Sequence, residues 1–225
     1  IFSLEMGAES LVERIICSHA SINAGHLKTG KLTPEEYTQY FVATGALSEA
    51  PIFIDDTPGI RVAEIRAKCR RLKQERNNLG LVVIDYLQLI EGNGKESRQQ
   101  EVSEISRNLK KLAKELKVPV IALSQLSRGV EQRQDKRPIM SDIRESGSIE
   151  QDADIVAFLY RDDYYRQEPD ENGHVPEVEP NSTIEVIIEK NRSGPRGTVE
   201  LNFMKEFNKF TNLVPDGVEQ NAPMA

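Results

Sequence analysis

The sequence has few of the residues that form covalent cross-links and metal clusters, and it has no long hydrophobic run. Its two cysteines, Cys17 and Cys69, lie in helical patterns without C-x-x-C spacing, which favours buried free thiols and a reducing, cytoplasmic setting. Its three histidines share no ligand spacing, so neither a metal site nor a hydrolytic triad is indicated. The longest apolar runs are too short to cross a bilayer and no signal peptide is visible, so we expect no membrane association.

A net positive charge is also lacking, because the 225 residues carry a net charge of −7. This balance excludes a surface coated with basic residues for nucleic acid, but it does not exclude a local site. Residues 128–144 carry a local excess of positive charge, in Arg128, Arg133, Lys136, Arg137 and Arg144. On this evidence alone a solvated flexible loop and a nucleic-acid contact both remain open for the stretch.

No linker rich in Pro, Gly or Ser divides the chain, so we expect one domain over residues 1–213 and a flexible tail over 214–225. Short β-branched runs alternate with segments of helical period, which is typical of an α/β fold with a mostly parallel sheet flanked by helices. Strands are expected at Ile1–Leu4, Ile52–Ile54, Leu81–Ile84, Val118–Leu123 and Ile155–Tyr160. Helices are expected at Ala8–Ser21, Pro34–Ser48, Arg61–Asn77 and Ser97–Lys117. A C-terminal β-hairpin is expected from Thr183–Glu189 and Thr198–Phe203, with a basic tip that contains glycine.

One segment matches most of the phosphate-binding loop pattern G-x-x-x-x-G-K-[ST], because Gly25 and Gly30 precede Lys31. The next residue is Leu32, which cannot bind magnesium, and the residues before Gly25 have a helical pattern instead of forming a strand. After the match, Thr33 has the features of a helix N-cap. We therefore interpret the segment as a turn between helices.

Polar side chains follow three of the predicted strands. Asp85 ends the apolar run Leu81–Ile84, Gln125 follows Val118–Leu123, and Glu5 follows the strand at the N-terminus. A carboxylate after a strand is often only a turn cap, and an amide there often only faces solvent. Open α/β sheets, however, bind ligands along the edge where the strands end, so the three residues together predict a site at that edge.

Five motifs occur in order and give a specific resemblance. The sequence is similar to the RecA-like C-terminal motor of bacterial replicative DNA helicases of the DnaB type, over essentially the whole chain to about Leu213. The motifs are SLEM (3–6), VIDYLQL (83–89), ALSQLSR (122–128), SDIRESGSIEQDAD (141–154) and KNRSGP (190–195).

The resemblance implies a RecA-like fold and an ATP-dependent DNA helicase that uses ATP and Mg²⁺. It implies that Glu5 polarises the attacking water, that Asp85 supports Mg²⁺ and that Gln125 senses the γ-phosphate. Arg14 falls where the family has an arginine near the nucleotide base, although an exposed helix residue is equally compatible with its pattern. Lys190 and Arg192 match positions that reach the nucleotide site of the neighbouring subunit, where positive charge stabilises the transferred phosphoryl group.

The resemblance also implies a homo-hexameric ring that moves on single-stranded DNA, with primase and a helicase loader as partners in the primosome. Arg144, Glu145 and Gly147 match the loop that lines the central channel, where a positive side chain and backbone N–H groups can hold phosphates. The absence of aromatic residues from 128–151 argues against base stacking as the main grip. The phosphate loop is expected upstream of Ile1, and this chain alone is therefore expected to be inactive.

Two other functions remain open at this point. The chain could be an interaction module that contacts a loader or DNA without turning over ATP. It could also be a recombinase-like ATPase that forms filaments on DNA. The motif at 141–154 and the hairpin at 190–195 favour the ring helicase over the filament.

Overall fold

The computed structural model describes residues 1–92, 94, 97–143, 147–165 and 179–213. The predicted tail therefore lies outside the described residues, and the domain boundary at 213 stays a prediction. Three helices follow the first strand: α1 (Ala8–Ala20), α2 (Ala24–Thr29) and α3 (Pro34–Glu49). They pack around a small core of Ile16, Cys17, Ile22 and Ala43. The predicted N-cap of α3 at Thr33 is confirmed as part of a capping box, because the Glu36 N–H donates to Thr33 Oγ1 while the Thr33 N–H donates to Glu36 Oε2.

The segment that resembles a phosphate loop forms helix α2 and its C-cap, so the prediction of a simple turn was incomplete. The Asn23 side chain caps this helix by accepting hydrogen bonds from the backbone N–H groups of Gly25 and His26, at 2.8 and 3.2 Å. Gly30 ends it in the left-handed region, with φ of 67°. Helix α1 comes directly before the segment, where a phosphate loop would follow a strand. This agrees with the interpretation that the segment is not a phosphate loop.

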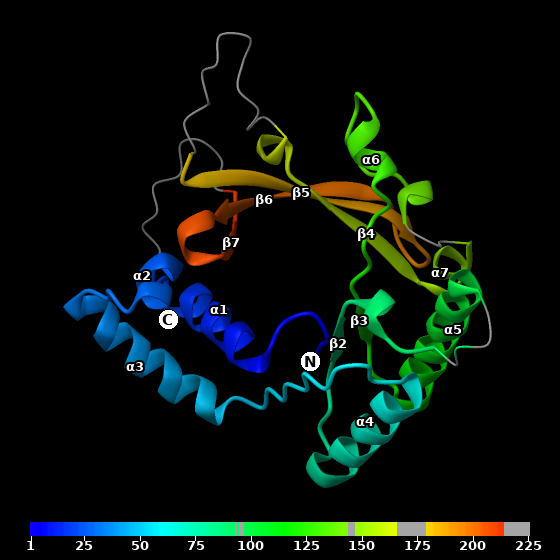
Figure 1. The fold of residues 1–225 in the computed structure, drawn as a ribbon, viewed down its shortest axis with the longest axis horizontal. Helices are drawn as coiled ribbons and strands as arrows, with labels where there is room; N and C mark the ends of the chain where they lie inside the picture. The colour runs from blue at the N-terminus through cyan, green and yellow to red at the C-terminus, as the bar shows by residue number, and fades with distance from the viewer. Residues whose placement is uncertain (93, 95–96, 144–146, 166–178, 214–225) are drawn as a thin grey trace.

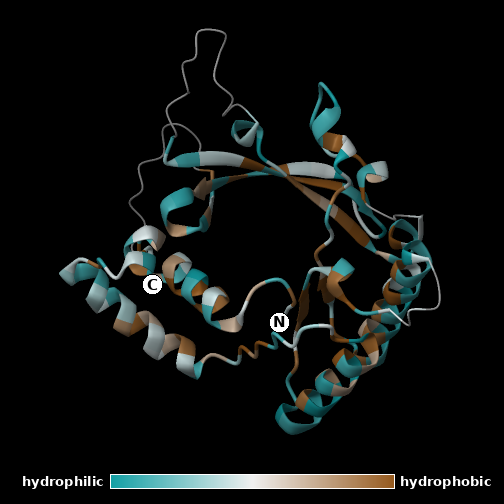
Figure 2. Cartoon of the chain, in the orientation of Figure 1, coloured by the Kyte–Doolittle hydropathy of each residue, from teal (hydrophilic) through white to brown (hydrophobic). Residues whose placement is uncertain are grey.

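One of the two sheets is parallel. Its strands are β1 (Phe2–Ser3), β2 (Val82–Asp85) and β3 (Val120–Ala122), in the order β1-β2-β3. Helices α4 (Val62–Arg76) and α5 (Arg98–Leu116) lie beside it in Figure 1. The apolar stripe of α5, which includes Val102, Ile105, Leu109, Leu112 and Leu116, is buried against the sheet residues Val82 and Ile84 in one core. Figure 2 shows the corresponding alternation of hydrophobic and hydrophilic residues along α5.

The residues Ile52–Ile54 do not form the predicted strand. They run beside β1, but the pairing is limited to one bridge between Phe2 and Asp55. The Asp55 N–H donates to Ile1 O and the Ser3 N–H donates to Asp55 O, each at 2.9 Å. Because β1 has only two residues, it offers too short an edge for a longer ladder.

The second sheet is antiparallel. Its strands are β4 (Ile155–Tyr160), β5 (Asn181–Asn191), β6 (Gly197–Met204) and β7 (Lys209–Asn212), in chain order. The predicted hairpin is confirmed as β5 and β6. The strand Ile155–Tyr160 is also confirmed, but it pairs antiparallel with β5 and does not join the parallel sheet. The eleven residues of β5 are long enough to pair with β4 on one side and β6 on the other. β7 was not predicted.

Short helical segments connect these elements. They are η1 (Leu87–Leu89), α6 (Gly129–Gln132), η2 (Met140–Asp142), α7 (Gly147–Asp152), η3 (Asp162–Tyr164) and η4 (Lys205–Phe207). Both cysteines are free and buried, as predicted, and burial raises the pKa of Cys69 to about 11. Over the part of the chain that is described, no helix combines the length and apolar character needed to span a bilayer.

Helices α4 and α5 are joined by one carboxylate. Glu115 on α5 forms ion pairs with Arg70 and Arg66, which lie one turn apart on α4. These two hydrogen bonds, that from Arg70 first, hold the pKa of Glu115 below its ordinary value. A lowered folded pKa means that the carboxylate stabilises the fold above its ordinary pKa and that this contribution is lost as the pH falls through the lowered value.

We therefore expect Glu115→Gln to lower the Tm at pH 7 by roughly 1–3 °C. The difference from the unchanged protein should shrink as the pH falls below about 4, because the Glu115 carboxylate takes up a proton first in the unfolded chain and then, at lower pH, in the folded protein. Thermal unfolding followed by circular dichroism between pH 3 and 7 measures the effect. The exposed Glu49, which has no side-chain partner in the described chain, provides the control Glu49→Gln. An equal loss at pH 3.5 and pH 7 would contradict the explanation.

Candidate active site

The three polar residues predicted at the strand ends lie along one edge of the parallel sheet. Ser3 of β1 is in register with Asp85, the last residue of β2. The backbone continues this pairing, because the Leu4 N–H donates to Asp85 O at 2.7 Å. On the other side of β2, the Leu123 N–H donates to Ile84 O at 2.9 Å. The segments that carry Glu5, Asp85 and Gln125 therefore leave the sheet side by side, as predicted.

The two carboxylates at this edge are free to bind a ligand. Asp85 is half-buried and Glu5 is exposed, and neither side chain has a hydrogen bond or ion pair within the described chain. No group of three metal-binding side chains occurs among the residues that the structure describes. The donor set suits Mg²⁺, which keeps several waters and needs only one or two protein carboxylates beside the phosphates of a nucleotide.

The connection that carries Glu5 is fixed on both sides. Within it, Ser3 Oγ donates to Met6 O at 2.7 Å. At its end, the Ala8 N–H donates to Asp56 Oδ2 at 2.9 Å, so that Asp56 supports the first turn of α1. The adjacent Asp55 pairs with Lys68 of α4 at 2.5 Å. Asp55 and Asp56 were not predicted to matter for the site; their position directly after the apolar run Ile52–Ile54 was the signal that could have revealed them.

Gln88 is a further residue that the sequence analysis did not single out. It lies in η1, three positions after Asp85, and its side-chain Nε2 donates to Ser124 Oγ at 2.8 Å. The Gln125 N–H donates to Gln88 Oε1 at 3.3 Å. Gln88 therefore links the end of β2 to the residues that follow β3. Its presence within the quoted motif at 83–89 was the available signal.

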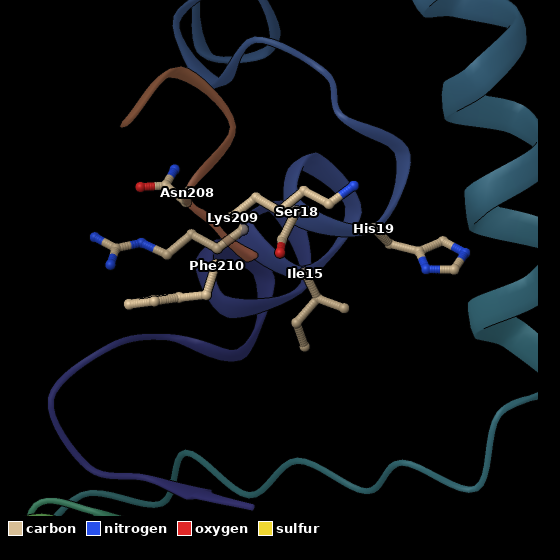
Figure 3. A pocket seen from close by; sticks show the side chains of 7 residues that line it. Ile15, Ser18, His19, Asn208, Lys209 and Phe210 are labelled. Carbon is tan, nitrogen blue, oxygen red and sulfur yellow. The ribbon is translucent and has the colours of Figure 1, made fainter. Parts of the chain in front are cut away.

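Arg14 lies apart from the sheet edge, on α1. It lines an open depression of about 580 Å³ together with Ile15, Ser18, His19, Asn208, Lys209 and Phe210. In Figure 3 the labelled residues of α1, the start of β7 and Asn208 before it lie around this depression, and His19 points away from the others. Lys209 Nζ donates to Ser21 Oγ at 2.8 Å, which holds β7 against the end of α1. The depression combines positive charge with an aromatic ring.

Lys190 and Arg192 lie at the end of β5 and the start of the turn, so Lys190 is a strand residue and does not belong to the tip. Lys190 Nζ donates to Glu150 O. The Arg192 N–H donates to Asp154 O at 2.8 Å, and its guanidinium pairs with Asp154 Oδ1 at 3.3 Å. Asp154 also pairs with Lys110 of α5, and that hydrogen bond is the main cause of its lowered pKa, to which Arg192 adds. The hairpin is thus anchored to α5 through one carboxylate.

The described part of the basic stretch, residues 128–143, is more ordered than a solvated flexible loop. Arg133 binds both oxygens of the buried Asp142, at 2.8 and 2.7 Å. Arg137 binds both oxygens of Glu185 on β5. Arg133 therefore connects two parts of the stretch, and Arg137 connects the stretch to β5. Arg144 and Glu145 lie outside the described residues, and Gly147 is exposed at the first position of α7.

Comparison with protein families places the chain in one of them. The model of the DnaB-like helicase C terminal domain matches residues 1–212. The chain belongs to this family. The replicative DNA helicase DnaC of Bacillus subtilis (strain 168) is 67% identical over 215 residues, which cover 95% of this chain and 45% of that protein. The chain thus spans about half the length of the curated relatives it matches.

Two solved structures agree with the fold. A DnaB-like replicative helicase, described with its interactions with primase, gives a TM-score of 0.86 at 48% identity and covers 95% of this chain and 50% of that one. A second structure, of an ATPase domain, gives a TM-score of 0.85 at 47% identity and covers 95% of this chain and 73% of that one. The predicted RecA-like α/β fold is confirmed.

The pair between Arg133 and Asp142 gives a prediction about stability. Asp142→Asn should lower the free energy of unfolding by roughly 1–3 kcal/mol, because the buried position loses its charge and one of the two oxygens that accept from Arg133. Urea unfolding measures this change. Glu131→Gln, at an exposed position in the same stretch, should change the value by less than about 0.5 kcal/mol. Equal effects of the two substitutions would show that the stretch is only solvated.

Proposed function

We propose that this chain is the ATP-hydrolysing motor of a longer replicative DNA helicase, which moves along single-stranded DNA and separates the duplex at the replication fork. The convergence of Glu5, Asp85 and Gln125 at the carboxyl edge of the parallel sheet carries this proposal. The family of the chain supports the same interpretation. The longer protein would supply the phosphate loop, for which the segment Gly25–Lys31 is no substitute.

Each residue has a distinct role in this proposal. Glu5, free and exposed, accepts a proton from the water that attacks the γ-phosphate. Asp85 holds Mg²⁺, which neutralises charge on the phosphate oxygens when it is bound. The amide of Gln125 contacts the γ-phosphate and so distinguishes ATP from ADP. Arg14 and Phe210 offer a cation and an aromatic face to the base of the nucleotide.

Lys190 and Arg192 act in the site of a neighbouring subunit in this proposal, which requires a ring of identical subunits, a homo-hexamer. Arg192 uses one side-chain donor on Asp154, and a guanidinium has five, so it can bind a phosphate without leaving its own chain. An exposed apolar area on α3, which includes Phe41 and Val42 at 69% and 70% exposure, offers a surface for packing between subunits.

Arg144, Glu145 and Gly147 remain our candidates for the grip on single-stranded DNA in the central channel. Gly147 opens α7, whose Ser148 Oγ donates to Ser103 Oγ of α5 at 2.8 Å. Primase and a helicase loader are the expected protein partners of the longer protein in the cytoplasm. Support for primase comes from the similar replicative helicase, whose structure was described together with its interactions with primase.

The first test compares ATP hydrolysis by the longer protein and its variants, with and without single-stranded DNA. Glu5→Gln should lower kcat by about 10²–10⁴-fold, because it removes a general base. Asp85→Asn should have a similar effect, because the amide is a poorer ligand for Mg²⁺. The controls Glu9→Gln and Lys31→Ala should leave the rate unchanged.

The alternatives give opposite results in the same assay. An interaction module predicts that Glu5→Gln changes nothing that can be measured. Loss of hydrolysis in Lys31→Ala would move the phosphate site to the segment Gly25–Lys31. An open filament on DNA, seen by electron microscopy, would overturn the ring.

The second test addresses action between subunits. Arg192→Ala should lower kcat by about 10³-fold or more, because it removes positive charge from the transferred phosphoryl group. Mixed rings of Arg192→Ala and Glu5→Gln subunits should regain part of this activity, since some sites then combine an intact Glu5 with an intact Arg192. Arg196→Ala, on the same hairpin, is the control and should retain activity. No recovery at any mixing ratio would show that Arg192 acts within its own subunit.

A further inference from the structure

The position of Gln125 depends on one side chain. Among the described residues, the only hydrogen bond of Gln125 is the one its N–H donates to Gln88 Oε1, and its own amide has none. The residues on either side are held by backbone contacts. Leu123 exchanges bonds with β2 and η1, since its N–H donates to Ile84 O and its O accepts from the Leu87 N–H, each at 2.9 Å. Leu126 bridges Ile143.

Gln88 fits this place because an amide offers a donor and an acceptor on one planar group. Its Nε2 donates to Ser124 Oγ and its Oε1 accepts from the Gln125 N–H. It therefore contacts both residues that leave β3 at the sheet edge. An apolar side chain of the same length would satisfy neither of them.

Gln88 is itself fixed to the start of α5. Arg98 Nη2 donates to Gln88 O at 2.6 Å, and Arg98 Nη1 pairs with Glu101 Oε2 at 2.8 Å. Glu101 in turn accepts from the Gly94 N–H at 2.9 Å. The hydrogen bond from Arg98, followed by that from Gly94, holds the pKa of Glu101 below its ordinary value, so the carboxylate stays charged at neutral pH. Gln88 is therefore supported from both its backbone and its side chain.

We propose that Gln88 is a positioning residue for hydrolysis, which holds the Ser124–Gln125 backbone at a fixed place relative to Asp85. This inference rests on the proposed function, because it gives Gln125 its contact with the γ-phosphate. Gln88 does not touch the nucleotide itself. Gln88 fixes the backbone from which the Gln125 side chain extends, and Arg98 connects Gln88 to α5. A displacement of about 1 Å in such a group can cost about 10²-fold in rate.

The test is a double-mutant cycle in the full-length protein, with DNA-stimulated ATP hydrolysis as the readout. Gln88→Met should lower kcat by roughly 10- to 100-fold and change the KM for ATP by less than about 2-fold, since the contact matters most in the transition state. If Gln88 acts through Gln125, the same substitution should have almost no further effect in a Gln125→Ala background. Gln99→Met, at an exposed position on α5, is the matched control and should leave kcat unchanged.

A second variant covers the case in which Gln88→Met does not fold. Ser124→Ala removes one of the two contacts of Gln88, so it should give a smaller fall in kcat that also disappears in the Gln125→Ala background. Multiplicative effects in either cycle, or an unchanged kcat in Gln88→Met, would overturn the inference. An unchanged kcat in Glu5→Gln would instead overturn the proposed function, and the two failures are therefore distinguishable.

Discussion

The pairing of three short parallel strands is the constraint on which the rest of the molecule depends. β1, β2 and β3 contribute two, four and three residues, so the sheet itself supplies few hydrogen bonds. Its register nevertheless decides that Ser3 lies beside Asp85 and that Ala122 lies beside Ile84. A shift of one residue in β1 would send Glu5 to the other face. The buried residues Ile84 and Phe2 resist such a shift because both belong to the core that α5 covers.

Helix α5 is the element that the different parts of the site share. Its first turn holds Gln88 through Arg98, its second contacts α7 through Ser103, and its later turns hold Asp154 and the arginines of α4. Each of these contacts is polar, whereas the apolar stripe of the same helix packs into the core. This one helix of nineteen residues thus holds the sheet edge, α7 and the hairpin at fixed positions relative to one another.

The sequence predicted the four longest helices and the sheet edge well, because their signals are local. Capping residues and three- to four-residue spacing located α1, α3, α4 and α5 to within one or two residues, and the ends of apolar runs located Asp85 and Gln125. The pairing partner of β4 could not be predicted in this way, since an apolar run such as Ile155–Tyr160 fits a parallel or an antiparallel sheet equally well. The sequence did not reveal the contacts of Gln88, Asp56 and Asp142. Gln88 and Asp56 contact residues that are distant in the sequence, and Asp142 contacts a residue of an irregular loop.

Helix α2 shows why a segment that matches a binding-loop pattern need not form a binding site. The two glycines and the lysine stand at the right intervals, but the N–H groups of the segment already have acceptors. Those of Gly25 and His26 donate to the side chain of Asn23, and those of Gly30 and Lys31 donate to backbone carbonyls of α2. A phosphate could bind here only by displacing the Asn23 side chain, which belongs to the same chain and therefore has a far higher local concentration. A point substitution that restored the full consensus after Lys31 would leave this competition in place.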